Sequence, residues 1–325
     1  MRHKNVVFTI IFALGVIQSQ ATVWRVNNNA AISANFTSFT AAQNAAVPND
    51  TLYFEGSSVS YGNIVLTKPL TIIGPGYFLS ENPQTQANKV TAKFGTIGFN
   101  TGSAGSTISG LDISNTVTIY VSSINIVRCF LKAISLNSNS SAISNILINS
   151  CFIYDDITSS GSQLISNVII TNNLIEGYGE SIDLGQNSSG VISNCILKDD
   201  LSVWNFTCSN NILTCCNVSQ NNNTFFNNIG SGSQFPSGNG NQQNINMTDV
   251  FVGATGNSTD GQYLLKPGSP AIGAGSDGTD CGIFGGITPY VLSGLPAIPA
   301  IYEINMSSAG TSTNGINVTV KAKTH

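Results

Sequence analysis

The side chains in this sequence that could do acid–base chemistry form two aspartate pairs with a glutamate between them. The pairs are Asp155-Asp156 and Asp199-Asp200, and the glutamate is Glu180. Two carboxylates about 6.5–9.5 Å apart can hydrolyse a glycosidic bond with inversion, whereas a cluster of oxygen ligands suits calcium. The four aspartates are therefore the candidates for catalysis, and Asp156, Asp200 and Glu180 are the candidates for a metal site in which calcium is the possible cofactor.

A second set of side chains near these acids could contact a ligand. Tyr178 could stack on a sugar ring, and Glu176 and Lys198 are the neighbouring candidates for ligand binding. The alternative is a solvated turn of aspartates beside a Glu176–Lys198 surface ion pair, which would contribute little to stability. We favour the solvated turn on sequence alone, and the binding site remains the competing interpretation.

Composition excludes several other functions. The histidines are His3, inside the expected leader, and His325, the last residue. A Ser-His-Asp triad, a Cys-His dyad and a His-ligated zinc inside the fold are therefore excluded. The formal net charge is −4. The sequence therefore lacks the excess of Lys and Arg that nucleic-acid-binding proteins use. For the same reason we expect no electrostatic attraction to anionic membranes.

The first residues have the pattern of a secretory signal peptide. Arg2, His3 and Lys4 precede the apolar run 6–17, and a small-x-small cleavage site ends at Ala21. The run is too short for a membrane anchor, which needs about 20 apolar residues. We expect residues 1–21 to be removed and the protein to be secreted to the extracellular space or the periplasm, with no membrane span.

The candidate residues lie in a repeat that must position them. Segments 122–135, 144–157, 166–179 and 188–201 share one pattern at a step of 22 residues. Such a period is typical of a solenoid, and short β-branched runs broken by Asn, Ser and Gly indicate strands rather than helices. We predict an all-β parallel β-helix. Because its coils stack about 4.8 Å apart, the two aspartate pairs would lie about 9.6 Å apart.

Equivalent positions of successive coils should form columns. The expected columns are Phe130/Phe152/Leu174/Ile196, Leu131/Ile153/Ile175/Leu197, the polar turn Ser150/Asn172/Asn194, and Cys129/Cys151/Asn173/Cys195. The seven cysteines are odd in number and lack metal-type spacing, so we expect free, buried thiols rather than a disulfide framework.

Alternation along the strands directs a further apolar column to the outer face. This outer column consists of Leu147, Ile169 and Val191. An apolar stripe left exposed on several coils would be unusual, so it needs a cover.

The expected organisation has four parts. Residues 1–21 are the signal peptide, 22–61 an N-terminal cap with a short helix over about 39–46, and 62–286 the parallel β-helix. Residues 287–325 form a C-terminal β segment that packs along the coils or makes a small hairpin.

Three segments give the chain a family resemblance. "NDTLYFEG", "KPLTIIGPG" and the closing "KPGSPAIGAGSDGTDCGIFGG", together with the Asn-rich coils, resemble secreted right-handed parallel β-helix proteins of the pectin-lyase-like superfamily, especially uncharacterised bacterial members. The resemblance implies right-handed coils.

The same resemblance argues against hydrolysis of the galacturonan type. The superfamily's lyases use several acids around calcium with an Arg or Lys base, and its galacturonan hydrolases use Gly-His-Gly and Arg-Ile-Lys motifs that this chain lacks. Two functions remain open: a non-catalytic extracellular scaffold that binds glycans or partners, which we favour, or a polysaccharide lyase or glycoside hydrolase that uses the acidic residues.

Overall fold

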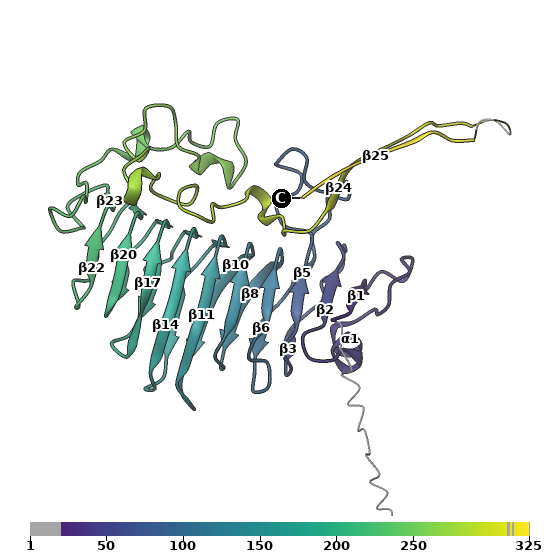
Figure 1. The fold of residues 1–325 in the computed structure, drawn as a ribbon, viewed down its shortest axis with the longest axis horizontal. Helices are drawn as coiled ribbons and strands as arrows, with labels where there is room; N and C mark the ends of the chain where they lie inside the picture. The colour runs from purple at the N-terminus through teal and green to yellow at the C-terminus, as the bar shows by residue number, and fades with distance from the viewer. Residues whose placement is uncertain (1–20, 311–312, 314, 325) are drawn as a thin grey trace, which may run out of the picture.

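The computed structural model describes residues 21–310, 313 and 315–324, so the expected signal peptide lies outside it except for Ala21. The described chain is a parallel β-helix, as the repeat predicts (Figure 1). Two all-parallel sheets of 10 and 13 strands, which we name sheets A and B, form the walls of the coils. No helix in the described residues is long and apolar enough to cross a membrane.

Sheet A is continuous along the rod. Its strands, in spatial order, are β1 (Val23–Val26), β2 (Thr51–Phe54), β4 (Thr71–Ile73), β7 (Thr107–Ser109), β9 (Ile124–Val127), β11 (Ile143–Asn149), β14 (Ile165–Thr171), β17 (Ser188–Ser193), β20 (Phe206–Ser209) and β22 (Thr224–Phe226).

Sheet B divides into two arms beyond the long strands β8 (Asp112–Ile119) and β10 (Phe130–Asn137). The first arm contains β12 (Phe152–Ile153), β15 (Leu174–Ile175), β18 (Ile196–Leu197), β21 (Ile212–Leu213) and β23 (Ile229–Gly230); the second contains β13 (Ile157–Ser160), β16 (Ile182–Leu184) and β19 (Leu201–Val203). β3 (Ile64–Leu66), β5 (Lys93–Phe94) and β6 (Ile97–Phe99) complete sheet B on the N-terminal side of β8.

The one α-helix of the described residues, α1 (Phe39–Ala45), closes the N-terminal end of the coils. Ser38 is its N-cap, and its hydroxyl accepts a hydrogen bond from the backbone N–H of Ala41. Phe39 and Ala42 are buried, so the helix covers the open end of the first coil as the sequence predicts.

The corner between sheet A and the first arm is built from left-handed residues. The predicted polar turn column Ser150, Asn172 and Asn194 has φ of 55°, 56° and 52°. Asn is the non-glycine residue that enters this region most readily, because its short polar side chain bonds locally. Each of these coils has one left-handed residue at this position, which makes a tight turn. The turn therefore recurs at the same place in successive coils.

Inside that corner the predicted Cys/Asn column is confirmed. The backbone N–H of Cys151 donates to Oδ1 of Asn173 at 2.8 Å, and the N–H of Cys195 donates to Oδ1 of Asn211 at 2.9 Å. Asn211 continues the column onto Asn228. Buried amides therefore bond the backbone of one coil to the next, where an apolar side chain would leave a buried N–H unsatisfied.

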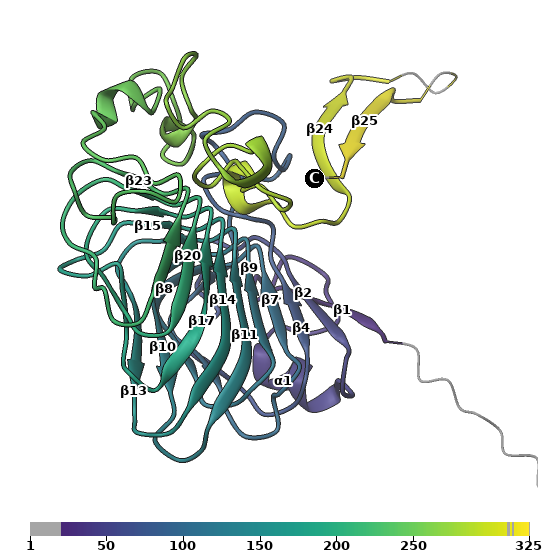
Figure 2. The same ribbon diagram turned by 60° about the vertical axis from the view of Figure 1, so that its left-hand side comes forward.

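The chain leaves the coils earlier than expected. The last strand of sheet B is β23, whereas we expected the β-helix to continue to residue 286. Residues 246–299, here named the return segment, run back along the left-handed corner from the C-terminal coils toward the N-terminal ones (Figures 1 and 2). The side-chain amide of Asn172 donates to the carbonyl oxygens of Ile283 and Gly285 at 2.9 and 2.8 Å.

The return segment covers an apolar column that faces out of the coils. The predicted column through Phe130 and Phe152 forms a hydrophobic cluster with buried residues of the return segment and Tyr77, whereas the neighbouring column through Leu131 and Ile153 fills the interior. The cluster members from the return segment are Val250, Tyr263, Ala271, Cys281, Ile283 and Tyr290. Four short 3₁₀ turns shape this segment: Met247–Asp249, Gly261–Tyr263, Ser276–Gly278 and Leu292–Gly294.

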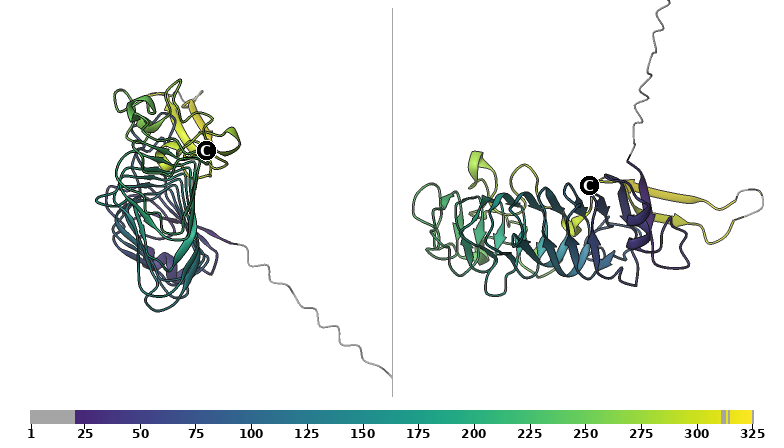
Figure 3. Two further views of the ribbon diagram at one scale, coloured as in Figure 1. Left: turned by 90° about the vertical axis from the view of Figure 1, so that its left-hand side faces the viewer. Right: turned by 90° about the horizontal axis from the view of Figure 1, so that it is seen from below.

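The end of the chain is a hairpin. β24 (Ala300–Met306) and β25 (Val318–Lys323) pair antiparallel and project beyond the coils (Figure 3). The outer apolar stripe is on sheet A as predicted, with Ile169 and Val191 still 37% and 38% exposed. Of the expected C-terminal segment 287–325, the hairpin takes its strands from residues 300–306 and 318–323, whereas residues 287–299 belong to the return segment over the first arm.

Candidate functional site

The five carboxylates chosen from the sequence lie, together with Asp183, where the first arm of sheet B meets the second. This set, here named the acidic corner, consists of Asp155, Asp156, Glu180, Asp183, Asp199 and Asp200. The pairing of Ile157 with Ile182, and of Ile182 with Leu201, fixes the register. Asp156 and Asp200 precede the first and the last of these paired residues, so they lie two coils apart as predicted, or about 9.6 Å at the spacing of strands.

The coil between them carries a projecting tyrosine. Tyr178 is 90% exposed and is flanked by Gly177 and Gly179, which have φ of 74° and 98°. A Cβ on Gly177 would come within 2.5 Å of Cβ of Asp199, so this close approach requires glycine. The backbone N–H of Gly179 donates to Oδ2 of Asp199 at 2.8 Å, which holds the loop against the next coil.

The carboxylates of the acidic corner perturb one another. Burial, with repulsion from Asp155 and then Asp183, raises the pKa of Asp156. Burial, with repulsion from Asp183, Asp200 and Asp156, raises the pKa of Glu180. Asp156 and Glu180 therefore hold their protons more tightly than isolated carboxylates do.

The three metal candidates do not converge. Among the described residues, the one group of three potential ligand atoms within 4.8 Å of one another is Asp199 with Cys215 and Cys216. Asp156, Glu180 and Asp200 do not form such a group. Asp200 instead accepts hydrogen bonds from the backbone and side-chain amides of Asn217, at 2.6 and 3.2 Å.

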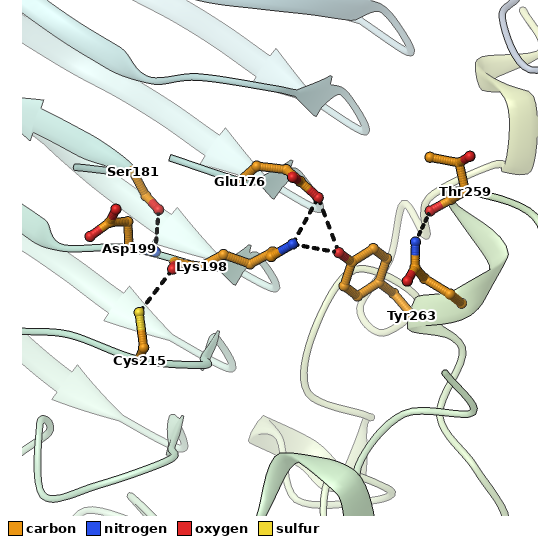
Figure 4. Close-up of polar contacts among 8 residues, drawn as sticks. Glu176, Ser181, Lys198, Asp199, Cys215, Thr259 and Tyr263 are labelled. Carbon is orange, nitrogen blue, oxygen red and sulfur yellow. Dashed lines mark hydrogen bonds and ion pairs between the residues drawn. The ribbon is translucent and has the colours of Figure 1, made fainter. Parts of the chain in front are cut away.

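Glu176 and Lys198 form the ion pair that the sequence suggests, and a tyrosine joins them (Figure 4). Nζ of Lys198 lies 2.9 Å from Oε1 of Glu176 and donates to the Tyr263 hydroxyl at 3.0 Å; this hydroxyl donates to Glu176 at 3.1 Å. Burial opposes the lysine charge, but the bonds to Tyr263 and Glu176 outweigh it and raise the pKa of Lys198. Lys198 is therefore a fixed ammonium group rather than a poised base.

The arginines are used elsewhere. Arg25 pairs with Glu55 in the N-terminal cap. Nη1 of Arg128 donates to the carbonyl oxygen of Leu295 at 2.7 Å, at the left-handed corner. Lys132 is the cation whose attraction partly offsets the raised pKa of Asp156. Within the part of the chain that the structure describes, neither Arg25 nor Arg128 is placed to act as a base at the acidic corner.

Sequence reasoning missed two tyrosines of this surface. Tyr154 is 60% exposed and precedes Asp155, in the outer column that runs from Lys132 to Glu176. Tyr263 comes from the return segment. Tyr154 could have been found from the column, because it occupies the repeat position equivalent to Glu176, whereas Tyr263 has no repeat partner that signals its place.

A groove on the outer surface of sheet B lies in the N-terminal coils. It encloses about 730 Å³, and its lining is uncharged, with hydroxyl and amide groups from residues such as Thr118, Asn137 and Ser140. The outward strand positions Thr118, Ser135, Thr158 and Asp183 pair in succession. A strip of small polar side chains therefore connects the groove to the acidic corner.

The fold and this surface define a β-helix solenoid with an open polar face. Comparison with known proteins finds no family model that matches the chain and no curated protein with significant similarity to it.

Proposed function

We propose that this protein is an exported, non-catalytic β-helix rod that binds glycans on the outer face of the second arm and at the acidic corner. The observation that carries the proposal is the exposure of Tyr178 on a loop bonded to the next coil. A surface aromatic ring with little burial contributes nothing to the core, but it offers a flat apolar face to a sugar. Export rests on the leader pattern in residues 1–21 and on the resemblance to secreted pectin-lyase-like proteins.

The groups around Tyr178 suit the polar half of a sugar. Carboxylates accept hydrogen bonds from hydroxyl groups, and charge-assisted bonds of this kind are about twice as strong as neutral ones. Tyr154 supplies a second exposed ring, and the strip from Thr118 to Asp183 supplies hydroxyl groups along the rod. An extended chain lying along the coils would meet all three features.

The negative charge of the acidic corner distinguishes neutral glycans from acidic ones. Asp156 and Glu180 already repel their neighbours, as their raised pKa values indicate. A uronate polymer would add negative charge to this cluster. The surface therefore favours a neutral polysaccharide over an acidic one.

Binding to immobilised polysaccharides tests the proposal. Affinity electrophoresis of residues 22–325 through gels containing β-glucan, mannan or polygalacturonate should show retardation by a neutral polymer and none by polygalacturonate without calcium. Tyr178→Ala should weaken binding about two- to tenfold, the range of one aromatic contact, and Tyr154→Ala should add to the loss. Tyr302→Ala, on the hairpin, is the matched control. Full retardation of the Tyr178→Ala protein would refute the site, and no retardation by any glycan would refute the function.

Glycoside hydrolysis is the second candidate, favoured by one observation. Asp156 has a raised pKa, as a general acid requires, and Asp200 lies two coils away at about 9.6 Å, near the separation used for inversion. A lyase is less favoured because Lys198 is held charged. New reducing ends released from a neutral glycan, and lost in both Asp156→Asn and Asp200→Asn, would establish the hydrolase.

A further inference from the structure

A disulfide joins two residues that are neighbours in the sequence. Cys215 and Cys216 are bonded, which corrects our expectation that all seven cysteines are free; the other five are free and buried. The pair follows β21 in a turn where Cys216 has φ of 72°. Cys215 is partly buried and Cys216 is exposed.

This bond has little to do with holding the fold together. A disulfide stabilises a protein chiefly by closing a loop of the unfolded chain, and the effect shrinks with the loop. The separation here is one residue, so almost no loop is closed. A different role is needed for two adjacent sulfur atoms at the surface.

The other five thiols are all buried. Burial raises the pKa of Cys195 and of Cys281 to about 12, and it raises the pKa of Cys151 and Cys208 as well. Thiolate is the reactive and metal-binding form of cysteine. Thiol chemistry in the described chain is therefore directed to Cys215 and Cys216.

A carboxylate stands beside the two sulfur atoms. A carboxylate oxygen of Asp199 and both Sγ atoms all lie within 4.8 Å of one another. Sγ of Cys215 is 3.0 Å from the carbonyl oxygen of Lys198, the residue before Asp199 (Figure 4). Asp199 is held from the other side, because it accepts hydrogen bonds from the N–H groups of Gly179 and Asp200. The three ligand atoms thus come from two neighbouring coils and are positioned by backbone contacts.

We propose that Cys215, Cys216 and Asp199 form a redox-gated site for a thiophilic divalent cation of the zinc or cadmium class. A dithiol reductant transfers two electrons and two protons to the disulfide and is itself oxidised to a cyclic disulfide. The two thiols then lose their protons to the solvent as the metal ion binds two thiolates and one carboxylate. Zinc prefers four ligands, and a water molecule on the solvent-exposed side, next to Cys216, would be the fourth. Soft thiolates select such ions over calcium, and the oxidised pair has no thiolate to offer.

Cadmium titration of the folded protein tests the site. After dithiothreitol treatment and anaerobic desalting, residues 22–325 should bind one cadmium ion per chain, measured by the ultraviolet thiolate-to-metal charge-transfer band. The oxidised protein should show no band. Cys215→Ser and Cys216→Ser should each weaken binding at least tenfold, and Asp199→Asn should weaken it less; Asp277→Asn, at an exposed position of the return segment, is the matched control and should bind as the parent does.

Two results would overturn the proposal. One is the absence of a charge-transfer band when stoichiometric cadmium is added to the reduced protein. The other is a band of equal strength in both serine variants, which would place the metal on the buried thiols. The comparison of oxidised with reduced protein needs no variant, and it is independent of whether the rod binds glycans.

Discussion

The cover over the first arm makes a strong prediction for Phe152. This side chain faces out of the coil but is only 3% exposed, because the segment after β4 and the return segment lie over it. Its ring lies 5.5 Å from the ring of Phe78 and 5.5 Å from that of Phe130. Phe152→Ala would leave a cavity between two elements that are distant in sequence.

The magnitude follows from that burial. Truncation of a buried Phe to Ala costs about 3–5 kcal/mol, and each lost aromatic pair adds about 0.5–1.5 kcal/mol. We expect a loss at the upper end of the first range, measured as the free energy of unfolding in urea by circular dichroism. Ile169→Ala, on the open face of sheet A, is the control and should cost about 1 kcal/mol or less.

Two outcomes would refute this reasoning. A loss below about 1 kcal/mol for Phe152→Ala would mean that the return segment does not cover the first arm. A second, earlier unfolding transition in the parent protein, with proteolytic cleavage confined to residues 246–299, would mean that the cover opens separately and that the coils do not depend on it.

Three further predictions concern the interior column and the acidic corner. Asn228→Ala should cost more than about 2 kcal/mol, because the buried amide makes four hydrogen bonds and each orphaned partner costs about 1–3 kcal/mol; Asn139→Ala, at an exposed position, should cost little. Millimolar calcium should raise the Tm if the corner binds it, and Asp156→Asn with Asp200→Asn should abolish the rise; an unchanged Tm in the parent protein would exclude calcium there. Because the folded-state pKa values of Asp156 and Glu180 lie above their ordinary 3.8 and 4.5, their contribution should raise stability as pH falls through the raised values. Asp156→Asn with Glu180→Gln should flatten the Tm–pH curve in that acidic range, and an unchanged slope would contradict the repulsion.

The coils were predictable because one physical rule fixes them. Backbone pairing between successive coils puts equivalent residues above each other, so the 22-residue step placed Asp156 and Asp200 two coils apart. The same rule placed Asn173 in the cysteine column. Neither result needed side-chain detail.

The side of the wall on which each apolar column lies was not predictable. Phe152 and Ile153 are adjacent and both buried, one outside the coil and one inside. Alternation along the strand predicts that the two side chains point to opposite faces of the wall. It does not predict which face is the interior, because a later segment buries the outward side chain as well. The return segment carries no repeat, so its docking on Asn172 and its delivery of Tyr263 to Lys198 left no periodic signal in the sequence.

The pairing of Cys215 with Cys216 was missed for a related reason. Both residues follow the last regular step of the repeat, and an odd number of cysteines in an apolar column argued for free thiols. The column argument holds for Cys129, Cys151 and Cys195, which are buried. It does not extend to a turn outside the column.

Asp199 connects the two proposals physically. One of its oxygens accepts the Gly179 N–H and thereby fixes the loop that presents Tyr178, and the same carboxylate stands beside the cysteine pair. A metal ion bound by the reduced pair would draw charge from this carboxylate and weaken its bond to Gly179. Faster hydrogen exchange of the Gly179 amide on cadmium binding is therefore expected in the reduced protein and not in the oxidised one. An unchanged exchange rate of the Gly179 amide would mean that the two sites share Asp199 but are not energetically coupled.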